Sequence, residues 1–393
     1  MFANSVAPLF AADAPPGFQA SRVTAVRCLL ISLLTTDRLS CADATNALGV
    51  EWVQQQGLAP FVWQVCRTTP NLSLEAGTQL QMSYYSAVGD AELQRRELHT
   101  VLSALLAAGI TPIVFKGAAL GRTVYPDSIC RPMGDLDLWI EPAELPHVQD
   151  VLRRLGYAQI TNPDRPPALM TQFGGEIHMS GVPSDTGLIE LHLSVFLGEW
   201  LRHAARVDET SVRVRVSSLE LESVPVRLMS PEDALIQSAT HLVINHQVSF
   251  FAARNLLDMA LLARRQSIDW DAVVQRAQAW RLAAVVWLAL NLAVNLLGLT
   301  EADAAVRVLA PSAFRRHFIT RLANPALIVG RRNLSQSRWR YVFLLLLVDR
   351  PRDAVKLVFR ALWPEREWLI ARYGRYTFST RLRHFLDAAR GRI

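Results

Sequence analysis

FKGAALGRTVYPDSICRPMGDLDLWI, residues Phe115–Ile140, is the segment from which the architecture of this chain can be worked out. It begins at the end of TPIVF (111–115), a short apolar and β-branched run that predicts a buried strand. The small-residue turn KGAA (116–119) then leads into a short helix. DLDLWI (135–140) alternates polar and apolar residues, which is typical of a strand with one buried face. Two strands separated by a turn and a helix predict the start of an α/β unit.

Further strands and helices are expected after this segment. LIELHLSV (188–195) alternates and predicts another strand, and EIHM (176–179) predicts a shorter one. Residues 142–155 have the pattern of a helix that Gly156 ends, while the rest of 161–187 is rich in Pro, Gly, Asp and Ser and predicts a loop. The expectation is a small mixed sheet with helices.

Helical patterns flank this unit on both sides. Apolar residues recur at three- and four-residue spacing from 20 to 108, where Gly109 follows as a C-cap glycine would. Ser-Pro-Glu-Asp (230–233) has a capping serine, proline at the first helical position and acids in the first turn. The expected fold class is therefore α+β. Three parts are predicted: an N-terminal helical segment (1–90), an α/β core (91–229) and a C-terminal helical domain with a basic tail (230–393).

The composition suits a chain with a large core, since 51% of the 393 residues are hydrophobic and 19% are charged. The four cysteines have no CxxC spacing, which argues against a disulfide scaffold and a cysteine zinc site and favours the reducing cytoplasm. Residues 1–20 contain no Lys or Arg, unlike a secretory signal peptide. Two apolar runs, 282–299 and 342–348, are borderline or too short for a bilayer crossing of about 20 residues. Both are expected to be buried helices.

Three carboxylates form the main chemical signal. Asp135 and Asp137 are two apart on an expected strand, so their side chains share a face, with Cα atoms about 6–7 Å apart. Glu190 lies at the centre of LIELH on another strand. Such a group makes sense when a divalent cation neutralises it, and magnesium prefers oxygen ligands and bridges to substrate phosphates. Two such ions about 4 Å apart can clamp both oxygens of a phosphoryl transfer.

An isolated Asp-x-Asp on a strand is more often a solvated polar face. The turn Lys116-Gly117-Ala118 favours a functional site, because it follows a buried strand and precedes Asp135 by fewer than 20 residues. Backbone N–H groups at such a turn and at the next helix N-terminus can hold phosphate oxygens. Lys116 is also one of only two lysines in the chain, the other being Lys356.

These pieces together resemble a known family. The Lys-Gly turn, RPMGDLD (131–137), LIELH (188–192) and, more loosely, SPEDALIQSATHL (230–242) occur in the order typical of the bacterial uncharacterised nucleotidyltransferase family. This family is a branch of the DNA polymerase β-type nucleotidyltransferase superfamily. The closer match covers about 80 residues, from 115 to 195. The resemblance implies a polymerase β-like core flanked by N-terminal helices and a C-terminal helical bundle.

The resemblance also implies roles for individual residues. Asp135 and Asp137 would be the metal-binding pair, and Glu190 would complete one metal site and orient or deprotonate the acceptor hydroxyl. Gly117 and Ala118 would lie at the phosphate-holding turn. In the superfamily this turn is usually Gly-Gly or Gly-Ser, so the Gly-Ala of this chain lacks a serine hydroxyl.

The nearby cations have two interpretations each. Lys116 or Arg131 could replace the missing phosphate contact, since arginine can bind phosphate bidentately. Alternatively, Lys116 could be an exposed residue at the end of a strand, and Arg131 could pair with Asp135 or Asp137 to hold the loop.

The strand histidines also leave alternatives open. His192 shares a face with Glu190, as His178 does with Glu176, and the preferred interpretation is that His192 orients Glu190. Two strand histidines beside carboxylates could instead bind a transition metal.

Two residue pairs of the expected C-terminal helices also have spacings that bear on the site. His241 and His246 are five apart, which places them on different faces of an α-helix. Arg254 and Asp258 are four apart and are expected to form an ion pair on one helix face. The competing hypothesis is that this helix closes over the cleft and supplies Arg254 to a phosphate.

The C-terminal tail is basic. Residues 315–393 carry 18 Lys+Arg and 5 Asp+Glu, or +13, so the rest of the chain carries −7 of the net +6. Arginines interleave with aromatic residues there, which is compatible with nucleic acid, with an anionic membrane surface, or with arginine stems packed over a helical bundle. The last alternative is the commonest.

The leading functional hypothesis is an enzyme that transfers a nucleoside monophosphate from an NTP, with ATP first, to a small-molecule or peptide acceptor. Its cofactor would be Mg²⁺ or Mn²⁺. The alternatives are a catalytically degenerate protein that senses nucleotide or binds a partner, and an enzyme that acts on nucleic acid. The sequence contains no P-loop, GxSxG or HExxH motif that would indicate a P-loop kinase, a serine hydrolase or a zincin.

Overall fold

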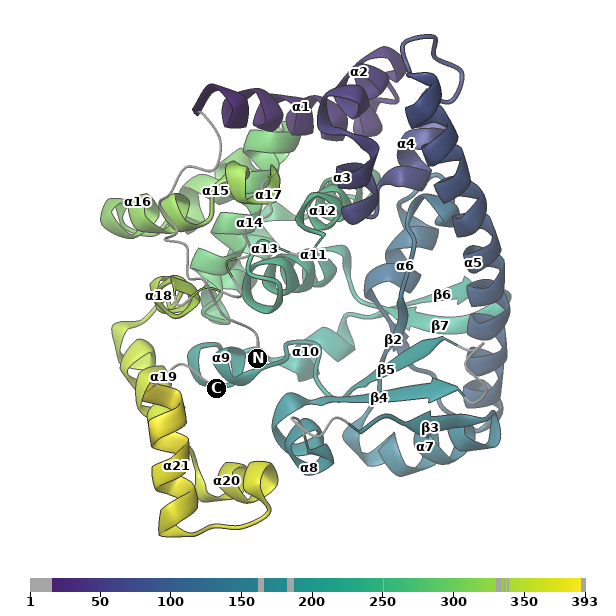
Figure 1. Cartoon of the computed structure of the whole chain (residues 1–393). Helices are drawn as coiled ribbons and strands as arrows, with labels where there is room; N and C mark the ends of the chain where they lie inside the picture. Colours follow the sequence, from purple (N-terminus) through teal and green to yellow (C-terminus); the bar gives the residue numbers. More distant parts are fainter. Residues whose placement is uncertain are drawn as a thin grey trace, which may run out of the picture.

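A computed structural model describes residues 16–161, 166–181, 187–249, 251–329, 334, 337 and 339–389 of the chain. The described strands form one mixed seven-stranded sheet in the order β3-β4-β5-β2-β1-β7-β6 (Figure 1). They are β1 (Ile113–Val114), β2 (Asp135–Trp139), β3 (Tyr157–Gln159), β4 (Glu176–Gly181), β5 (Leu188–His192), β6 (Ser217–Leu221) and β7 (Val224–Leu228). The expected α+β class is confirmed.

Helices precede the sheet, connect its strands and follow it. Those before it are α1 (Pro16–Thr35), α2 (Arg38–Leu48), α3 (Val50–Gln55), α4 (Ala59–Cys66) and α5 (Leu74–Ala107). Those between strands are α6 (Lys116–Thr123), η1 (Ser128–Cys130), η2 (Pro142–Glu144), α7 (Leu145–Arg154), α8 (Pro167–Leu169), η3 (Met170–Gly174), α9 (Glu199–Ala204) and α10 (Glu209–Val214). Those after it are α11 (Pro231–Thr240), η4 (His241–Asn245), α12 (Ala252–Arg265), α13 (Trp270–Ala279), α14 (Ala283–Leu297), η5 (Thr300–Ala302), α15 (Asp303–Leu309), α16 (Ala313–Leu322), α17 (Pro325–Val329), α18 (Trp339–Leu346), α19 (Pro351–Leu362), α20 (Arg366–Tyr373) and α21 (Phe378–Ala389).

Strand β2 lies in the middle of the sheet, antiparallel to β1 and parallel to β5. In the β2–β5 ladder Asp137 lies opposite Glu190. In the antiparallel β4–β5 ladder His178 lies opposite the same Glu190. Because residues opposite each other in a ladder point to the same face of the sheet, these side chains converge on one face.

The other face of β2 is packed against helices. Leu136, Leu138 and Ile140 share a hydrophobic cluster with Leu102 of α5 and Val148 of α7. Helix α5 runs along the sheet in Figure 1. The prediction that the apolar residues of this strand point into a core, away from the acids, is confirmed.

The short strands β3, β6 and β7 were not predicted from the sequence, and most side chains of β6 are exposed. The loop predicted over 161–187 was partly wrong, because α8 and η3 are helical and β4 extends to Gly181. Residues 162–165 and 182–186 of that loop lie outside the described residues. The strand predicted over 188–195 ends at His192.

Helices from before and after the sheet share one hydrophobic core. Leu29 of α1, Val62 of α4, Leu256 of α12 and Leu288 of α14 belong to the same buried cluster. Helix α14 contains the apolar run noted in the sequence, and most of its side chains are buried, as expected. No helix among the described residues has the length and apolar character needed to cross a bilayer. The division of the chain at residues 90 and 229 stays a prediction.

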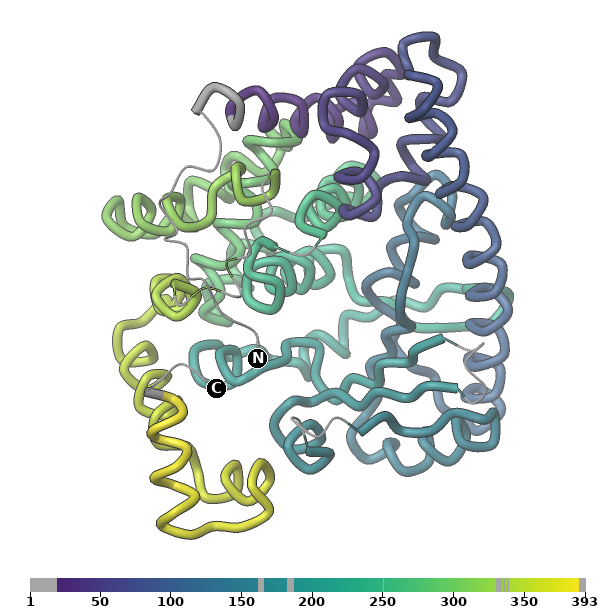
Figure 2. The backbone as a smooth tube through the Cα atoms, in the orientation of Figure 1, coloured from purple at the N-terminus to yellow at the C-terminus, as the bar shows by residue number. Residues whose placement is uncertain are grey.

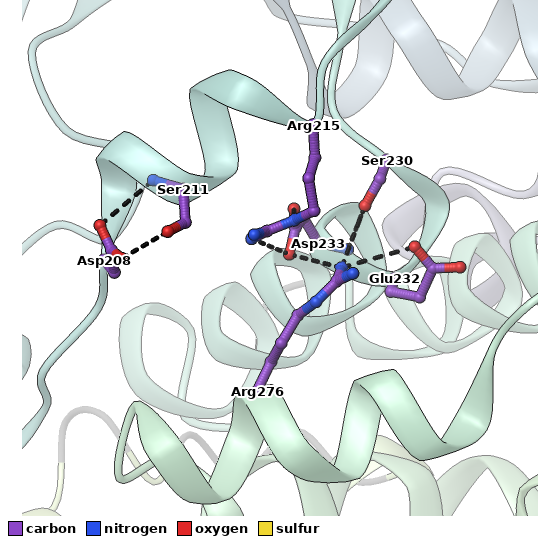
Figure 3. A network of polar contacts seen from close by, with 7 residues as sticks. All are labelled: Asp208, Ser211, Arg215, Ser230, Glu232, Asp233 and Arg276. Atoms are coloured by element: carbon purple, nitrogen blue, oxygen red, sulfur yellow. Dashed lines mark hydrogen bonds and ion pairs between the residues drawn. The ribbon is translucent and has the colours of Figure 1, made fainter.

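A polar network fixes the start of α11 (Figure 3). The Ser230 hydroxyl accepts a hydrogen bond from the Asp233 backbone N–H at 3.3 Å, which confirms the predicted cap. The fully buried Asp233 carboxylate pairs with Arg215 at 2.8 Å and with Arg276 at 2.9 Å. The network therefore ties the segment after α10 and the helix α13 to the first turn of α11.

Helices α19–α21 lie on the opposite side of the molecule from β6 and β7 (Figures 1 and 2). Leu369 of α20 packs in a small cluster with Leu169 of α8. Guanidinium groups of this region lie over aromatic rings, for example Arg381 over Trp363 with 4.4 Å to the ring centroid. These contacts fit the interpretation in which arginine stems pack over a helical bundle.

Candidate functional site

The predicted site residues, with the exception of Ala118, line one cavity of about 550 Å³ between the sheet and the helices α11–α12. Asp135 and Asp137 come from β2, and Glu190 comes from the neighbouring parallel strand β5. All three carboxylates line the cavity. The alternating pattern of each strand sends its acids to this face, and the ladder register brings the two strands' acids together.

Asp137 is the most enclosed of the three acids, with 1% of its surface exposed. Its Oδ1 accepts hydrogen bonds from Lys116 Nζ and interacts with His192 Nε2, each at 2.7 Å. Burial opposes ionisation of this carboxyl, but the Lys116 ammonium and the His192 ring hold its pKa well below the usual range. Asp137 is therefore a carboxylate at neutral pH.

Asp135 has the opposite electrostatic environment. Burial, followed by the negative charges of Asp137 and Glu190, raises the pKa of Asp135 to about 6. Two neighbouring acids of one strand thus differ strongly in acidity. Such divergence is common where charge is gathered for binding or catalysis.

Lys116 is largely enclosed beside the acids, with 16% of its side chain exposed, and is not an exposed residue at the end of a strand. Its Nζ lies 2.7 Å from Asp137 Oδ1 and 3.8 Å from Glu190 Oε2. Burial opposes its charged form, yet the two carboxylates raise the pKa of Lys116 above its ordinary value. Its backbone has a left-handed φ of +50°, which a non-glycine residue rarely adopts. A strained residue at a cluster of charges is typical of a functional site.

The first turn of α6 reaches the cavity through Gly117 but not through Ala118. Gly117 lines the cavity, whereas Ala118 belongs to the core of the sheet and is not among the cavity-lining residues that the structure describes. A Cβ added at Gly117 would lie 2.8 Å from Arg131 Nη1, so glycine permits the close approach of this arginine. The phosphate-holding role of the turn stays a prediction.

Arg131 does not pair with Asp135 or Asp137, so that alternative was wrong. Its guanidinium pairs with Asp258 of α12, with Nη2–Oδ2 at 2.8 Å and Nε–Oδ1 at 3.0 Å. Tyr125 donates a further hydrogen bond to Asp258 at 2.7 Å. Arg131 therefore joins the loop before β2 to a helix more than 120 residues later in the chain.

The expected ion pair between Arg254 and Asp258 is accordingly wrong. Asp258 is engaged by Arg131 and Tyr125, and Arg254 Nη1 instead donates to the Pro132 carbonyl at 3.1 Å. The long-range bidentate contact replaces the local pair that helix spacing predicts.

His192 contacts two of the acids. Its Nε2 lies 2.7 Å from Asp137 Oδ1 and 3.4 Å from Glu190 Oε2, and its ring is fully buried. Burial opposes protonation, but the hydrogen bond with Asp137 raises the pKa of His192 above its ordinary value. His192 therefore contacts Asp137 more closely than Glu190, the residue that it was expected to orient, and its orienting role stays a prediction.

Two groups of side chains among the described residues could hold a metal ion. One consists of Asp137, Glu190 and His192, and the other of Glu176, His178 and Glu190. Within each group the ligand atoms lie within 4.8 Å of one another. His178 Nε2 is 3.6 Å from both Glu176 and Glu190. Glu190 is thus common to both groups.

The far wall of the cavity contains residues that the sequence analysis placed wrongly or missed. The rings of His241 and His246 lie against each other in a tilted arrangement, with centroids 4.3 Å apart and planes inclined by 52°, and both line the cavity. The reason is that η4 is a π-helix, in which the His246 N–H donates to the His241 carbonyl at 3.0 Å. Residues five apart are joined by the backbone hydrogen bond of a π-helix and so lie close together, and π-helical turns are frequent at functional sites. No residue pattern in the sequence distinguishes this turn from an α-helix.

Comparison with known proteins agrees with this geometry. Residues 47–298, which include every residue of the cavity, match the family model described as uncharacterised nucleotidyltransferase. This match spans more than half of the chain, and the protein belongs to that family. Among curated proteins, none matches the chain.

Proposed function

We propose that the protein is a metal-dependent nucleotidyltransferase that moves a nucleoside monophosphate from an NTP to a hydroxyl or phosphate oxygen of an acceptor. The observation that carries this proposal is the register of the parallel strands, which places Asp137 opposite Glu190 with Asp135 on the same face. ATP is the first candidate donor, and a small molecule or a peptide is the first candidate acceptor. The family of the chain supports the same reaction class.

The donor atoms of the site fit a divalent cation. Asp137, Glu190 and His192 each offer one ligand atom, and these atoms lie within 4.8 Å of one another. Asp135 adds a second carboxylate from β2. Carboxylate oxygens are the ligands that Mg²⁺ prefers and Mn²⁺ accepts. We assign Asp135, Asp137 and Glu190 as the metal ligands, and His192 as the residue that orients Asp137 through its hydrogen bond. The bound cations would neutralise charge on the α-phosphate and activate the attacking hydroxyl, as in two-metal phosphoryl transfer.

The residues of the chain would then position the reactants. The acceptor oxygen attacks the α-phosphorus in line with the leaving group, an O–P bond forms, and the bond to pyrophosphate breaks. Glu190 orients an acceptor hydroxyl and takes its proton. Lys116, Gly117 and the backbone N–H groups at the start of α6 hold phosphate oxygens. Most of the rate enhancement would come from positioning and charge neutralisation.

A second function is favoured by one specific contact. The Lys116 ammonium already lies 2.7 Å from Asp137, so the acids have a counter-charge without any metal. A catalytically degenerate protein could use such a site to sense nucleotide or to bind a partner. It would bind nucleotide without a need for divalent cations.

Thermal-shift titration with ATP, GTP, CTP and UTP, with Mg²⁺ or with EDTA, distinguishes these functions. The transferase predicts stabilisation that needs both metal and nucleotide and disappears in Asp135→Asn. Asp150→Asn is the matched control, because Asp150 is an exposed acid of α7 that does not line the cavity. Nucleotide binding that is equal in EDTA and in Asp135→Asn would contradict the transferase and support the degenerate protein.

The remaining assignments are also proposals. We infer a cytoplasmic location from the four cysteines, which are free thiols in the structure. The basic C-terminal helices are candidates for peripheral membrane contact or, less favourably, for nucleic acid.

A further inference from the structure

Besides the acids of β2 and β5, the cavity is lined by two arginines and one carboxylate of α12 and the loop before β2. Arg131, Arg254 and Asp258 all line the cavity, so two positive charges are accompanied by one negative charge. Asp258 is bound bidentately by Arg131 and also accepts a hydrogen bond from Tyr125. One positive charge, that of Arg254, is left over.

Arg254 has unused donors. Its Nη1 donates to the Pro132 carbonyl at 3.1 Å, and its guanidinium lies over the Phe251 ring, 4.2 Å from the centroid. Its Nε is buried and has no hydrogen-bond partner in the part of the chain that the structure describes. No described carboxylate forms an ion pair with it. Because a guanidinium has five N–H donors, Arg254 can still grip an anion through several of them.

Arg254 remains charged in this setting. Burial and the neighbouring Arg131 lower the pKa of Arg254 to about 10, which is still far above neutral pH. A partly buried charge without a partner is costly, and a bound anion would remove that cost.

The position of Arg254 is held by the N-terminal helices. Gly57 has a left-handed φ of +67°, and a Cβ added there would lie 2.6 Å from Arg254 Nη1. Gln56 Oε1 accepts a hydrogen bond from the Ala253 backbone N–H at 3.1 Å and so fixes the first turn of α12. Phe251, which precedes this turn, is itself left-handed with a φ of +49°. Non-glycine residues in this left-handed conformation, such as Phe251, cluster at active sites and ligand-binding segments.

We propose that Arg254 binds the terminal phosphates of the nucleoside triphosphate, the part that leaves as pyrophosphate. This inference rests on the proposed function and adds the subsite for the leaving group. The carboxylates of β2 and β5 would attract the cation-bound α-phosphate, and Arg254 must then meet the remaining negative charge. Negative charge grows on pyrophosphate as its bond to the α-phosphorus breaks, and a positioned arginine stabilises it.

Binding of inorganic pyrophosphate, measured by calorimetry in the presence of Mg²⁺, tests the inference directly. We expect Arg254→Gln to weaken pyrophosphate and NTP binding about 10- to 100-fold, the range for a charged hydrogen-bonded contact. Arg254→Lys should lose less, because it keeps a point charge without the fork of donors. Affinity for the nucleoside monophosphate and for Mn²⁺ should stay within about twofold of wild type. Arg264→Gln, an exposed arginine of the same helix, is the matched control and should change nothing.

Three results would overturn the inference. The first is a wild-type protein that does not bind pyrophosphate, and the second is an unchanged pyrophosphate affinity in Arg254→Gln. The third is an equal loss of monophosphate and pyrophosphate binding together with a lowered melting temperature, which indicates a structural role. The proposed function fails separately: pyrophosphate binding that depends on Arg254, in a protein whose nucleotide binding ignores divalent cations, would keep the anion subsite and reject the transferase.

Discussion

Asp135→Asn should stabilise the metal-free protein at neutral pH. The folded state raises the pKa of Asp135 from 3.8 to about 6, so ionised Asp135 costs folding free energy. A shift of about two units corresponds to about 3 kcal/mol above pH 7. The unfolded state loses its proton first as pH rises, so this penalty grows from pH 3.8 to about 6 and is constant at higher pH.

The asparagine variant removes the penalty, and its advantage therefore depends on pH. For 393 residues the unfolding entropy is about 0.8 kcal/mol/K, so about 3 kcal/mol corresponds to about 4 °C in melting temperature. The gain should be about 4 °C at pH 8 and about 1 °C at pH 4.5. Calorimetric melting in EDTA across this pH range measures this gain. Asp150→Asn is the exposed control, and its free energy of unfolding should change by less than about 0.5 kcal/mol.

The addition of Mg²⁺ and nucleotide should reverse the order of the two proteins, since only the wild type keeps both carboxylates of β2 for the cation. A variant that melts at or below the wild-type temperature at pH 8 in EDTA would refute the electrostatic reasoning. So would a gain that is the same at pH 4.5 and pH 8, because it would then come from packing rather than from ionisation.

Three other substitutions probe the remaining contacts. Lys116→Met should destabilise the protein in EDTA by about 3 kcal/mol, because it leaves Asp137 without its closest cation. Mn²⁺ should then raise the melting temperature of the variant by more than it raises that of the wild type. Equal melting temperatures of the two proteins in EDTA would count against this. His192→Phe should weaken Mn²⁺ binding about 10- to 100-fold by calorimetry, since the ring no longer orients Asp137, and an unchanged affinity would reject the orienting role. Asp233→Asn should cost about 3–5 kcal/mol in urea unfolding while nucleotide binding stays intact, because it leaves Arg276 and its neighbours without their buried carboxylate; a cost under about 1 kcal/mol would show that the network in Figure 3 contributes little.

The strand that carries the acids was predictable from the sequence because its signal is local. Asp135 and Asp137 alternate with Leu136 and Leu138, and a period of two places the acids on one face whatever surrounds the strand. The N-cap at Ser230 was predictable for the same reason. The pairing of Asp137 with Glu190 was not, because register depends on the sheet as a whole.

The errors lie where long-range contacts override local rules. Helix spacing pairs Arg254 with Asp258, but Arg131 reaches the same carboxylate from 127 residues away with a bidentate geometry. An α-helical period places His241 and His246 on different faces, but a single π-turn brings their rings into contact. The sequence gives no reason for a glycine at position 57; the structure gives one, because a Cβ there would collide with Arg254.

Because Lys116 and Lys356 are the only lysines, the chain has two ε-amino groups, one in the cavity and one on the exposed surface of α19. Only the neutral amine attacks an acylating reagent, and the carboxylates around Lys116 keep it protonated. Lys356 should therefore be acylated first. The mass of the peptide that contains Lys116 then reports how far the surrounding carboxylates slow the acylation of Lys116. A ligand that binds these carboxylates in place of Lys116 should free its amine to react, and binding would then be detected as acylation at this one position.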